Sequence, residues 1–521
     1  MERMKASLLL GLSLCAVLSA DTYPRQPGID VQHYVFRISL SDDTDEIAGE
    51  TTVTVRFVQE GVTRVALDLG SAMTVSEVGT DRFRREADRL LIDLDSAPKA
   101  GEMRQFSIKY HGKPAFGLKI STNKYAERCF FSANWPDLAH HWLPTIDHPY
   151  DKATGEFIVT APSRYQVVAN GALEEEIDLG DGRRVTHWNQ RVPIATWLYN
   201  IGVAQFASRH FGAVAGVPLQ TWVFRQDRAA GMATFEDATR RAVEFFSSHV
   251  GRYPYQKLAD VQSAGNSGGM EHASAIFYGE KVVDGKPAYG LVAHETAHQW
   301  FGDSVTEKDW DDVWLSEGFA TYFAALATEH YEGRDAFVAS MLRSREQVYR
   351  TEKRMPGVAV VQDKPWQGIP NAIVYQKGGW VLHLLRAQVG TARFWAGIRE
   401  YYRRYRDSNA STGDFQKVME DVSGQDLGWF FRQWVYRAGS PVIAGGWTYD
   451  PAAKRLQVEL EQTQAGEPFR LPLEVAVGSR IERIEMTQRR QRFEISAAEP
   501  PASVTLDPNT WMLMEARFEK K

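Results

Sequence analysis

The sequence is poor in cysteine and carries little net charge. Its 521 residues include two cysteines, Cys15 and Cys129, so a framework of several disulfides is excluded and stability must come from packing. Cys129 has no second cysteine near it, and we interpret it as buried apolar filler rather than as a redox or zinc group. With 60 Lys and Arg against 66 Asp and Glu, the chain lacks the basic excess that a nucleic-acid partner requires. We therefore expect no nucleic-acid partner.

The N-terminus also lacks an apolar run long enough to span a bilayer. Arg3 and Lys5 precede an apolar run over residues 6–17, which is shorter than the roughly 20 residues that a membrane helix needs. Ser19 and Ala20 then precede the polar Asp21, which is the order of a secretory signal peptide. We predict a signal peptide over residues 1–20, cleavage near Ala20, export to a periplasm or the medium, and no stable membrane insertion afterwards. A short membrane anchor is the alternative.

The length exceeds what one hydrophobic core usually serves, so we expect three domains in a multidomain α+β fold. Residues 21–205 hold short alternating runs separated by Gly, Asp and Pro, which predict an antiparallel β domain. Residues 206–440 are dominated by helical apolar spacing, and residues 441–521 return to alternation, which predicts a β-sandwich.

The segment "LVAHETAHQWFGD" carries the first chemical motif. His294 and His298 are four residues apart, so on a helix both imidazoles face one side and can bind one metal ion, with Glu295 beside them. Glu317 lies 19 positions after His298, within an apolar helical pattern where a carboxylate is costly to bury unless it is paired or bound to metal. A place on the solvated helix face is the alternative for Glu317. Two His and one Glu would leave a fourth Zn²⁺ position open, which is typical of catalytic zinc.

A carbonyl under attack also needs a hydrogen-bond donor for its developing oxyanion. Tyr375 precedes a Lys-Gly-Gly start to an apolar helix, where a phenol could be held facing a cleft. From the residues alone, a buried structural Tyr is the simpler interpretation, because the chain has 20 tyrosines.

The chain resembles the M1 family of zinc metallopeptidases, the gluzincin aminopeptidases, in the spacing of four residues: His294, Glu295, His298 and Glu317. "GGMEH" stands where the family carries its Gly-x-Met-Glu-Asn exopeptidase motif, and "VYQKGG" is similar to its Tyr-x-Lys-Gly motif. "WLPTIDHPYDKATGEFIVTAP" and "DLGWFFRQWVYRAGSPVI" also resemble family segments, so the likeness runs from about residue 25 to the end of the sequence.

The resemblance implies an N-terminal β saddle domain, a thermolysin-like α/β catalytic domain and a C-terminal β-sandwich. It implies one Zn²⁺ bound by His294, His298 and Glu317, with Glu295 as general base. It also turns Tyr375 from a structural residue into the expected stabiliser of the transition state. The implied activity is removal of the N-terminal residue from peptides.

The same resemblance makes "GGMEH" the substrate-binding segment. Glu271 is expected to bind the free α-ammonium, because a carboxylate at a fixed distance from zinc accepts a charge-assisted bond from an amine that internal peptide segments lack. Gly268 and Gly269 are expected to offer backbone to an added substrate strand, beside Met270.

Three departures from the family pattern limit this inference. His272 replaces the usual Asn, and we expect it to titrate near neutral pH or to change the pocket shape. Ala133 and Trp135 stand where many members have Gln and Glu, so a second amine anchor is absent or is replaced by Asn134. The sequence also ends after the expected β-sandwich, where many members continue into a helical domain, which predicts a more open cleft or one covered by a homodimer or another subunit.

We therefore predict an exported zinc aminopeptidase that acts on peptides with a free N-terminus. The first rival is a related zinc hydrolase with endopeptidase activity or relaxed amine selectivity, because Ala133, Trp135 and His272 weaken the amine anchor. The second rival is a non-catalytic peptide-binding scaffold. It is disfavoured because every ligand and base of the motif is present.

Overall fold

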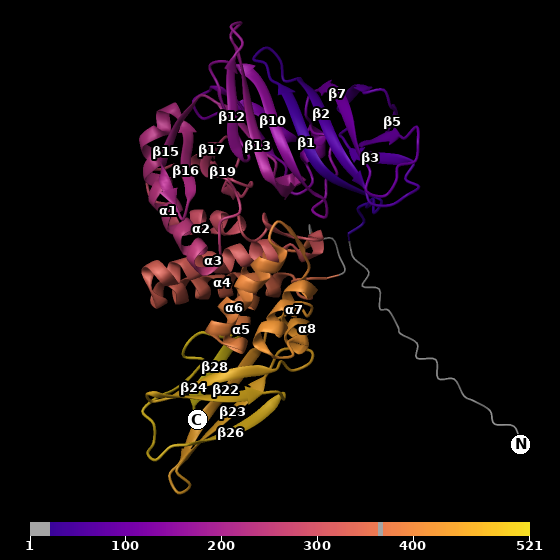
Figure 1. The fold of residues 1–521 in the computed structure, drawn as a ribbon. Helices are drawn as coiled ribbons and strands as arrows, with labels where there is room; N and C mark the ends of the chain where they lie inside the picture. Colours follow the sequence, from indigo (N-terminus) through magenta and orange to yellow (C-terminus); the bar gives the residue numbers. More distant parts are fainter. Residues whose placement is uncertain (1–20, 363–367) are drawn as a thin grey trace, which may run out of the picture.

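The structure, a computed structural model, describes residues 21–362 and 368–521, so the predicted signal peptide lies outside the described residues. Sheets form the N-terminal part, helices form most of the middle, and two further sheets form the C-terminal end (Figure 1). Within the described ranges, no helix is long and apolar enough to cross a membrane. Cys129 is buried, as predicted.

The N-terminal part consists of three sheets. The largest has the order β12(Ala172–Asp178), β13(Arg183–Ala195), β10(Lys152–Pro162), β1(Ile29–Ser39), β2(Ile47–Phe57), β7(Met103–Gly112) and β4(Met73–Val78). The second sheet has the order β11(Gln166–Ala169), β14(Ile201–Ala204), β9(Arg128–Ala133) and β8(Gly117–Thr122). The third has the order β3(Arg64–Asp68), β6(Arg89–Asp93) and β5(Arg82–Glu86). Successive side chains of a strand point to opposite faces, so β7 buries Phe106, Ile108 and Tyr110 while the residues between them are more exposed.

The middle part begins with a five-stranded sheet. Its order is β15(Phe206–Val214), β16(Val217–Phe224), β17(Leu258–Ser263), β19(Ala275–Gly279) and β18(Gly269–Met270). β18 is antiparallel to β19 and lies at the edge of the sheet, so its other side has no strand beside it among the described residues. Gly269 and Met270 of the "GGMEH" motif therefore form an edge strand.

The middle part also holds α-helices, the first of them between β16 and β17 in the chain and the others after the sheet. They are α1(Arg228–His249), α2(Tyr289–His298), α3(Trp314–Glu332), α4(Arg334–Arg354), α5(Gly378–Val389), α6(Thr391–Tyr405), α7(Thr412–Ser423) and α8(Gly428–Trp434), with a small parallel pair β20(Val305–Glu307) and β21(Ser408–Ala410). α3 is buried over most of its length because both its faces are apolar, and α2, α4 and α5 pack around it.

The C-terminal part holds a four-stranded and a three-stranded sheet. The four-stranded sheet has the order β26(Arg490–Ser496), β23(Arg455–Gln462), β22(Val442–Asp450) and β28(Glu515–Lys520). The three-stranded sheet has the order β25(Arg480–Met486), β24(Leu471–Val477) and β27(Val504–Leu506). Alternate residues of both sheets are buried, for example Leu456 and Val458 of β23 and Leu471 and Leu473 of β24.

Two lysines, Lys257 buried and Lys152 partly buried, join the N-terminal part to the middle part. Lys152 Nζ donates to the carbonyls of Asp303 at 3.0 Å and Ser304 at 2.8 Å. Lys257 Nζ donates to the carbonyls of Ala169 at 2.9 Å and Ser274 at 3.1 Å. Burial lowers the pKa of Lys152 to about 8 and that of Lys257 to about 7. These contacts fix the N-terminal sheets against the segments that flank the candidate site.

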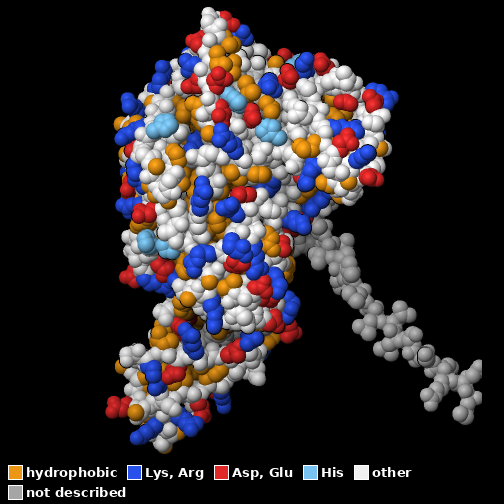
Figure 2. Space-filling model, viewed as in Figure 1, with side chains coloured by type: hydrophobic (Ala, Val, Ile, Leu, Met, Phe, Trp, Pro, Cys, Tyr) orange, Lys and Arg blue, Asp and Glu red, His pale blue; other side chains and the backbone are white. Residues whose placement is uncertain are grey.

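On the face shown in Figure 2, Lys and Arg side chains are interspersed with Asp and Glu side chains over all three parts. Neighbouring charges form ion pairs, such as Arg403 with Glu400 at 2.7 Å. The charge on this face is therefore balanced locally rather than gathered into a patch of one sign.

Candidate metal centre and active site

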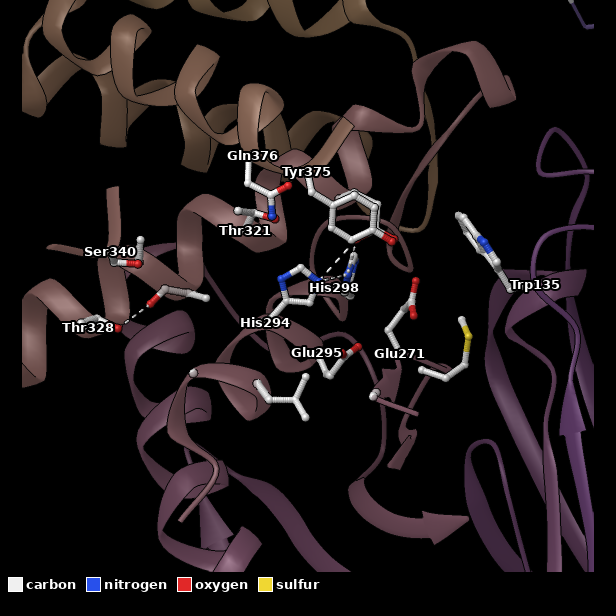
Figure 3. A pocket seen from close by; sticks show the side chains of 18 residues that line it. Trp135, Glu271, His294, Glu295, His298, Thr321, Thr328, Ser340, Tyr375 and Gln376 are labelled. Carbon is white, nitrogen blue, oxygen red and sulfur yellow. Dashed lines mark hydrogen bonds and ion pairs between the residues drawn. The ribbon is translucent and has the colours of Figure 1, made fainter. Parts of the chain in front are cut away.

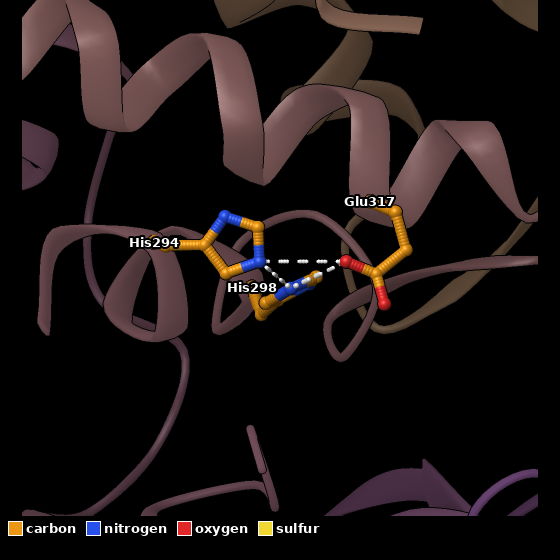
Figure 4. A group of neighbouring side chains, drawn as sticks. All are labelled: His294, His298 and Glu317. Carbon is orange, nitrogen blue, oxygen red and sulfur yellow. Dashed lines mark hydrogen bonds and ion pairs between the residues drawn. The ribbon is translucent and has the colours of Figure 1, made fainter. Parts of the chain in front are cut away.

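Two helices bring three metal-ligating side chains together. His294 and His298 lie one turn apart on α2, and Glu317 lies in the first turn of α3 (Figure 4). The two Nε2 atoms are 3.2 Å apart, and Glu317 Oε2 lies 3.4 Å from His294 Nε2 and 3.3 Å from His298 Nε2. Zinc ligands at tetrahedral angles are about 3.3 Å apart when each lies about 2.0 Å from the ion. The triangle therefore has the dimensions of one face of a zinc tetrahedron.

The contacts of His298 test whether these residues fit a cation. His298 Nδ1 lies 3.3 Å from the carbonyl oxygen of Phe301, which can only accept a hydrogen bond, and 3.1 Å from Ser316 Oγ. A proton on Nδ1 leaves the lone pair of Nε2 facing the carboxylate of Glu317, an arrangement that calls for a cation between them. Burial would raise the pKa of Glu317, but His298 and His294 lower it to about 2. The donor set therefore fits a divalent metal.

Glu295 is buried beside this triangle. Burial, and the nearby carboxylate of Glu271, raise the pKa of Glu295 well above its ordinary value. Gly269 makes room for it, because a Cβ on Gly269 would lie 2.2 Å from the carboxyl carbon of Glu295. The glycine before Met270 thus has a steric reason, in addition to the backbone role expected from the sequence.

Glu271 follows the edge strand β18 and is 4% exposed. Oxygens of Glu271 and Glu295 and a ring nitrogen of His298 all lie within 4.8 Å of one another. Burial raises the pKa of Glu271. Two neighbouring buried carboxylates are stabilised by positive charge, so this part of the site is suited to an ammonium group next to a metal.

His272 lies outside the cavity. Its ring packs edge-on against Phe277, with centroids 4.8 Å apart, and neither ring nitrogen has a hydrogen-bond partner among the described residues. Burial lowers its pKa to about 3. The expectation that His272 titrates near neutral pH is therefore wrong, because its charged form would have to be desolvated. Its side chain is not among the groups that line the cavity.

Tyr375 faces the metal triangle from a different helix. It belongs to a π-helical turn, Ile373–Lys377, that precedes α5, and its hydroxyl donates to Glu317 Oε1 at 2.5 Å. Lys377 is buried in the same turn, where its Nζ bonds Glu352 at 2.8 Å and the carbonyl of Gly439 at 2.9 Å. Lys377, which the sequence argument left without a role, thus fixes the turn that presents Tyr375.

The helices α3 and α5 approach each other closely at glycines. A Cβ on Gly318 would lie 2.9 Å from the carbonyl carbon of Gly378, and a Cβ on Gly378 would lie 3.1 Å from the Cα of Gly318. The absence of side chains at this crossing lets Tyr375, three residues before Gly378, reach Glu317, one residue before Gly318.

The three metal-ligating side chains, together with Glu271, Glu295 and Tyr375, line a cavity of about 680 Å³. In Figure 3, Glu271 lies between the metal-ligand histidines and Trp135, while Thr328 and Ser340 lie at the opposite end. Trp135 packs edge-on against Trp197 and Trp310, with centroids 4.9 Å apart in both pairs. The cavity therefore extends in both directions from the metal triangle.

Of the two alternatives for the second amine anchor, replacement by Asn134 is wrong. Its side chain is completely buried, its amide nitrogen donates to the carbonyl of Tyr199 at 2.7 Å, and its oxygen accepts from Trp142 Nε1 at 2.9 Å. Both ends of the amide are engaged away from the cavity. The structure brings together all predicted site residues except His272, and Trp135 forms the cavity wall beside Glu271.

A β-rich N-terminal part is followed by a helical part, whose His-Glu-x-x-His helix and downstream Glu bring together the ligands of one metal centre. This combination of fold and site is that of a zinc metallopeptidase. The Peptidase family M1 domain matches residues 235–434, and the Peptidase M1 N-terminal domain matches residues 30–198. Together these matches cover more than half of the sequence. The chain belongs to peptidase family M1.

Known proteins similar to this chain include glutamyl aminopeptidase of Rattus norvegicus, 27% identical over 64% of this chain and 37% of that protein. Probable aminopeptidase 2 of Sulfurisphaera tokodaii is 29% identical over 58% of this chain and 41% of its own length. The chain thus spans well under half of these relatives. The M1 zinc metallopeptidase structure from Deinococcus radiodurans matches with a TM-score of 0.70 and 26% identity, over 79% of this chain and 94% of that one.

Proposed function

We propose that the protein is a zinc-dependent aminopeptidase that hydrolyses the N-terminal peptide bond of peptides. The observation that carries the proposal is the position of Glu271, whose carboxylate lies within 4.8 Å of Glu295 and His298. An anchor this close to the metal ligands leaves space for one residue between a bound amine and the scissile carbonyl. The names of the relatives, both aminopeptidases, support the same activity.

Each side chain then has a defined task. When bound by His294, His298 and Glu317, Zn²⁺ supplies Lewis-acid polarisation of the scissile carbonyl. Glu271 holds the α-ammonium and fixes the register of the substrate. Glu295, whose pKa is raised by burial, accepts the proton of the attacking water and passes it to the leaving amine.

Tyr375 and the edge strand complete the proposed site. The Tyr375 hydroxyl, now bonded to Glu317, is placed to donate instead to the developing oxyanion. The free edge of β18 offers the backbone of Gly269 to an extended substrate as an added strand, beside Met270. Gly268 directly precedes the strand, and its carbonyl accepts from the N–H of Gly279 at 2.8 Å.

A paired substrate tests the proposal. We expect the purified protein with Zn²⁺ to cleave leucyl-anilide and to leave its N-acetyl form intact. Glu271→Ala should lower kcat/KM for the free substrate by about 100-fold or more, because a charge-assisted bond at a buried site is lost. Cleavage of both substrates at similar rates by the unmodified protein would contradict the proposal.

One observation favours relaxed amine selectivity as a second candidate. Asn134 is engaged elsewhere, and Ala133 and Trp135 carry no carboxylate, so Glu271 has no acidic companion from this segment. Measurable cleavage of the acetylated anilide, still dependent on Glu295 and Zn²⁺, would support that candidate.

We extend the proposal to the domain organisation. Residues 21–205, 206–440 and 441–521 are proposed as an N-terminal β domain, a thermolysin-like catalytic domain and a β-sandwich. The first strand of the five-stranded sheet begins at Phe206, which supports the first boundary. The buried alternate residues of β23 and β24 support a sandwich, since each sheet covers one side of an apolar layer.

We also propose export, with removal of residues 1–20 as a signal peptide, on the residue pattern of the N-terminus. N-terminal sequencing of the protein recovered outside the cytoplasm should begin at Asp21. Light scattering of that protein would distinguish a monomer from the homodimer considered above.

A further inference from the structure

The residue after the last metal ligand of α2 connects the metal helix to the amine anchor. Gln299 follows His298 directly and is completely buried. Its side chain points toward the segment that carries Glu271 rather than into the cavity, which it does not line. The mechanism proposed above gives it no task.

All hydrogen-bonding groups of the Gln299 amide are engaged. Its Nε2 donates to the carbonyl oxygen of Glu271 at 2.9 Å and to Asp303 Oδ2 at 2.8 Å. Its Oε1 accepts from the backbone N–H of Ser274 at 2.8 Å and lies 3.0 Å from the Tyr253 hydroxyl, whose single proton is shared with the carbonyl of Lys257 at 2.9 Å. Both donor hydrogens of the amide and its oxygen therefore have partners, which fixes the orientation of the side chain.

The residues after Glu271 are also held by Asn170, which donates to the carbonyl of Ala273, and by Lys257, which donates to the carbonyl of Ser274. For the carbonyl of Glu271 itself, the Gln299 amide is the hydrogen-bond partner found among the described residues. β18 contains only Gly269 and Met270, and its pairing with β19 ends at Met270, one residue before the anchor. Ser274 has a φ of 64°, so the chain reverses there in a conformation that a non-glycine residue adopts at a cost. Gln299 bonds Glu271 at one end of this turn and Ser274 at the other.

We propose that Gln299 is a positioning residue that sets the distance between the Glu271 carboxylate and the metal ligands. Because Gln299 is covalently next to His298, its two backbone contacts place the anchor segment in register with α2. The inference rests on the proposed aminopeptidase function, because it assigns Glu271 to the substrate amine. Loss of the amide lets the anchor shift, and a shift of about 1 Å in such a site costs up to about 100-fold in rate.

The variant Gln299→Met tests this by retaining length and removing the hydrogen bonds. We expect kcat/KM for a free aminoacyl-anilide to fall by about 10- to 100-fold, and the preference for free over acetylated substrate to fall with it. Tyr253→Phe removes one of the bonds to Gln299 and serves as a milder variant that keeps the packing. Its expected loss is smaller and in the same direction.

Gln262→Met is the matched control. Gln262 is also fully buried, but its amide bonds the backbone of Phe224 at 2.9 Å and Asp227 at 2.7 Å, away from the anchor segment. It should lose thermal stability to a similar extent while the preference for the free amine stays unchanged.

A double-mutant cycle with Glu271→Ala decides the question. If Gln299 acts through the anchor, Gln299→Met should change kcat/KM by less than about threefold in the Glu271→Ala background, with zinc content retained by elemental analysis. An equal loss in both backgrounds, or a loss of zinc, overturns the inference. Should Gln299→Met fail to fold, the same cycle with Tyr253→Phe gives the answer.

Different results would overturn the proposed function and the role of Gln299. If the unmodified protein does not prefer the free amine, the proposed function itself is wrong. If it does prefer the free amine and the cycle is additive, only the role of Gln299 is wrong.

Discussion

At the scale of single residues, the site depends as much on missing side chains as on reactive ones. Gly269 begins the edge strand β18 and Gly268 directly precedes it, and neither has a positive φ, so the backbone accepts alanine at both. Their surroundings differ. A Cβ at Gly269 would lie 2.2 Å from Glu295, whereas a Cβ at Gly268 would have no described atom within 4 Å.

This difference gives a prediction with its own control. Gly269→Ala should lower kcat/KM by about 100-fold or more, because Glu295 must leave its position and general-base catalysis contributes about 100- to 10,000-fold. Gly268→Ala should stay within about threefold of the unmodified protein. Anilide kinetics with circular dichroism as a check on folding would measure both, and equal effects of the two variants would contradict the steric argument.

At the scale of elements, α3 and α5 hold the phenol over the metal triangle through a crossing of two glycines. Gly318→Ala places a methyl group 2.9 Å from the backbone of Gly378, so α5 and the π-helical turn before it must move. We expect Tyr375 to lose its contact with Glu317 and kcat to fall by about 10- to 100-fold with little change in KM, because the phenol acts in the transition state.

Gly413→Ala, on α7, is the control for that substitution. A Cβ there has only an ordinary contact, 3.7 Å from Ser411 Oγ, and alanine is the better helix former. Its kcat should be unchanged and its melting temperature equal or slightly higher. A kcat loss in Gly413→Ala as large as that in Gly318→Ala would show that helix substitution in general, rather than this crossing, causes the effect.

The metal ligands link the helices α2 and α3, so metal removal should affect stability as well as activity. A ligand at 100 times its dissociation constant stabilises a fold by about 2.7 kcal/mol. We expect a chelator to abolish anilide cleavage and to lower the melting temperature by several degrees, with both restored by Zn²⁺. Glu317→Ala should be inactive and should show no zinc-dependent melting shift. Full activity in the presence of the chelator would refute this assignment.

At the scale of the whole molecule, the features that could be predicted from the sequence are those that depend on residues close together in the chain. The metal helix follows from the spacing of His294 and His298, and the N-terminal sheets follow from alternating apolar residues. Buried polar groups whose partners come from distant segments could not be predicted. The buried Lys257 and the partly buried Lys152 are the main examples, because a lysine at or just before the start of a strand is expected to face solvent until its carbonyl partners are known.

The same limit applies near the site. Gln299 looks like an ordinary residue after a motif, and its contacts with Glu271, Ser274 and Asp303 are visible only in the folded chain. His272 was expected to titrate, because the sequence does not show that its ring is completely buried. Family resemblance supplied the role of Tyr375, and the glycine crossing supplies the physical reason for its position.

The pH dependence of folding stability provides a test on this largest scale. Asp151, which precedes β10, is buried, and its Oδ2 accepts from the backbone N–H of Val31 on β1 at 3.4 Å. Burial raises its pKa to about 8, although the bond from Val31 opposes the rise. In the unfolded chain its pKa is about 3.9. Between these values the folded state binds a proton that the unfolded state releases, so this group's contribution to stability falls as the pH rises from about 4 to 8.

Asp151→Asn removes this titration while keeping an oxygen that can accept from Val31. We expect the variant to be more stable than the unmodified protein at pH 9, by an amount on the order of a few kcal/mol, and the difference to shrink steadily toward pH 4. Lys152 and Lys257 change stability with pH in the opposite direction, because burial lowers their pKa values. Both lysines are present in the unmodified protein and in the variant, so their effects cancel in the comparison. Denaturant unfolding of both proteins across this range measures the difference. A gap that is constant with pH, or one that widens toward acid, would show that Asp151 is already ionised in the folded protein.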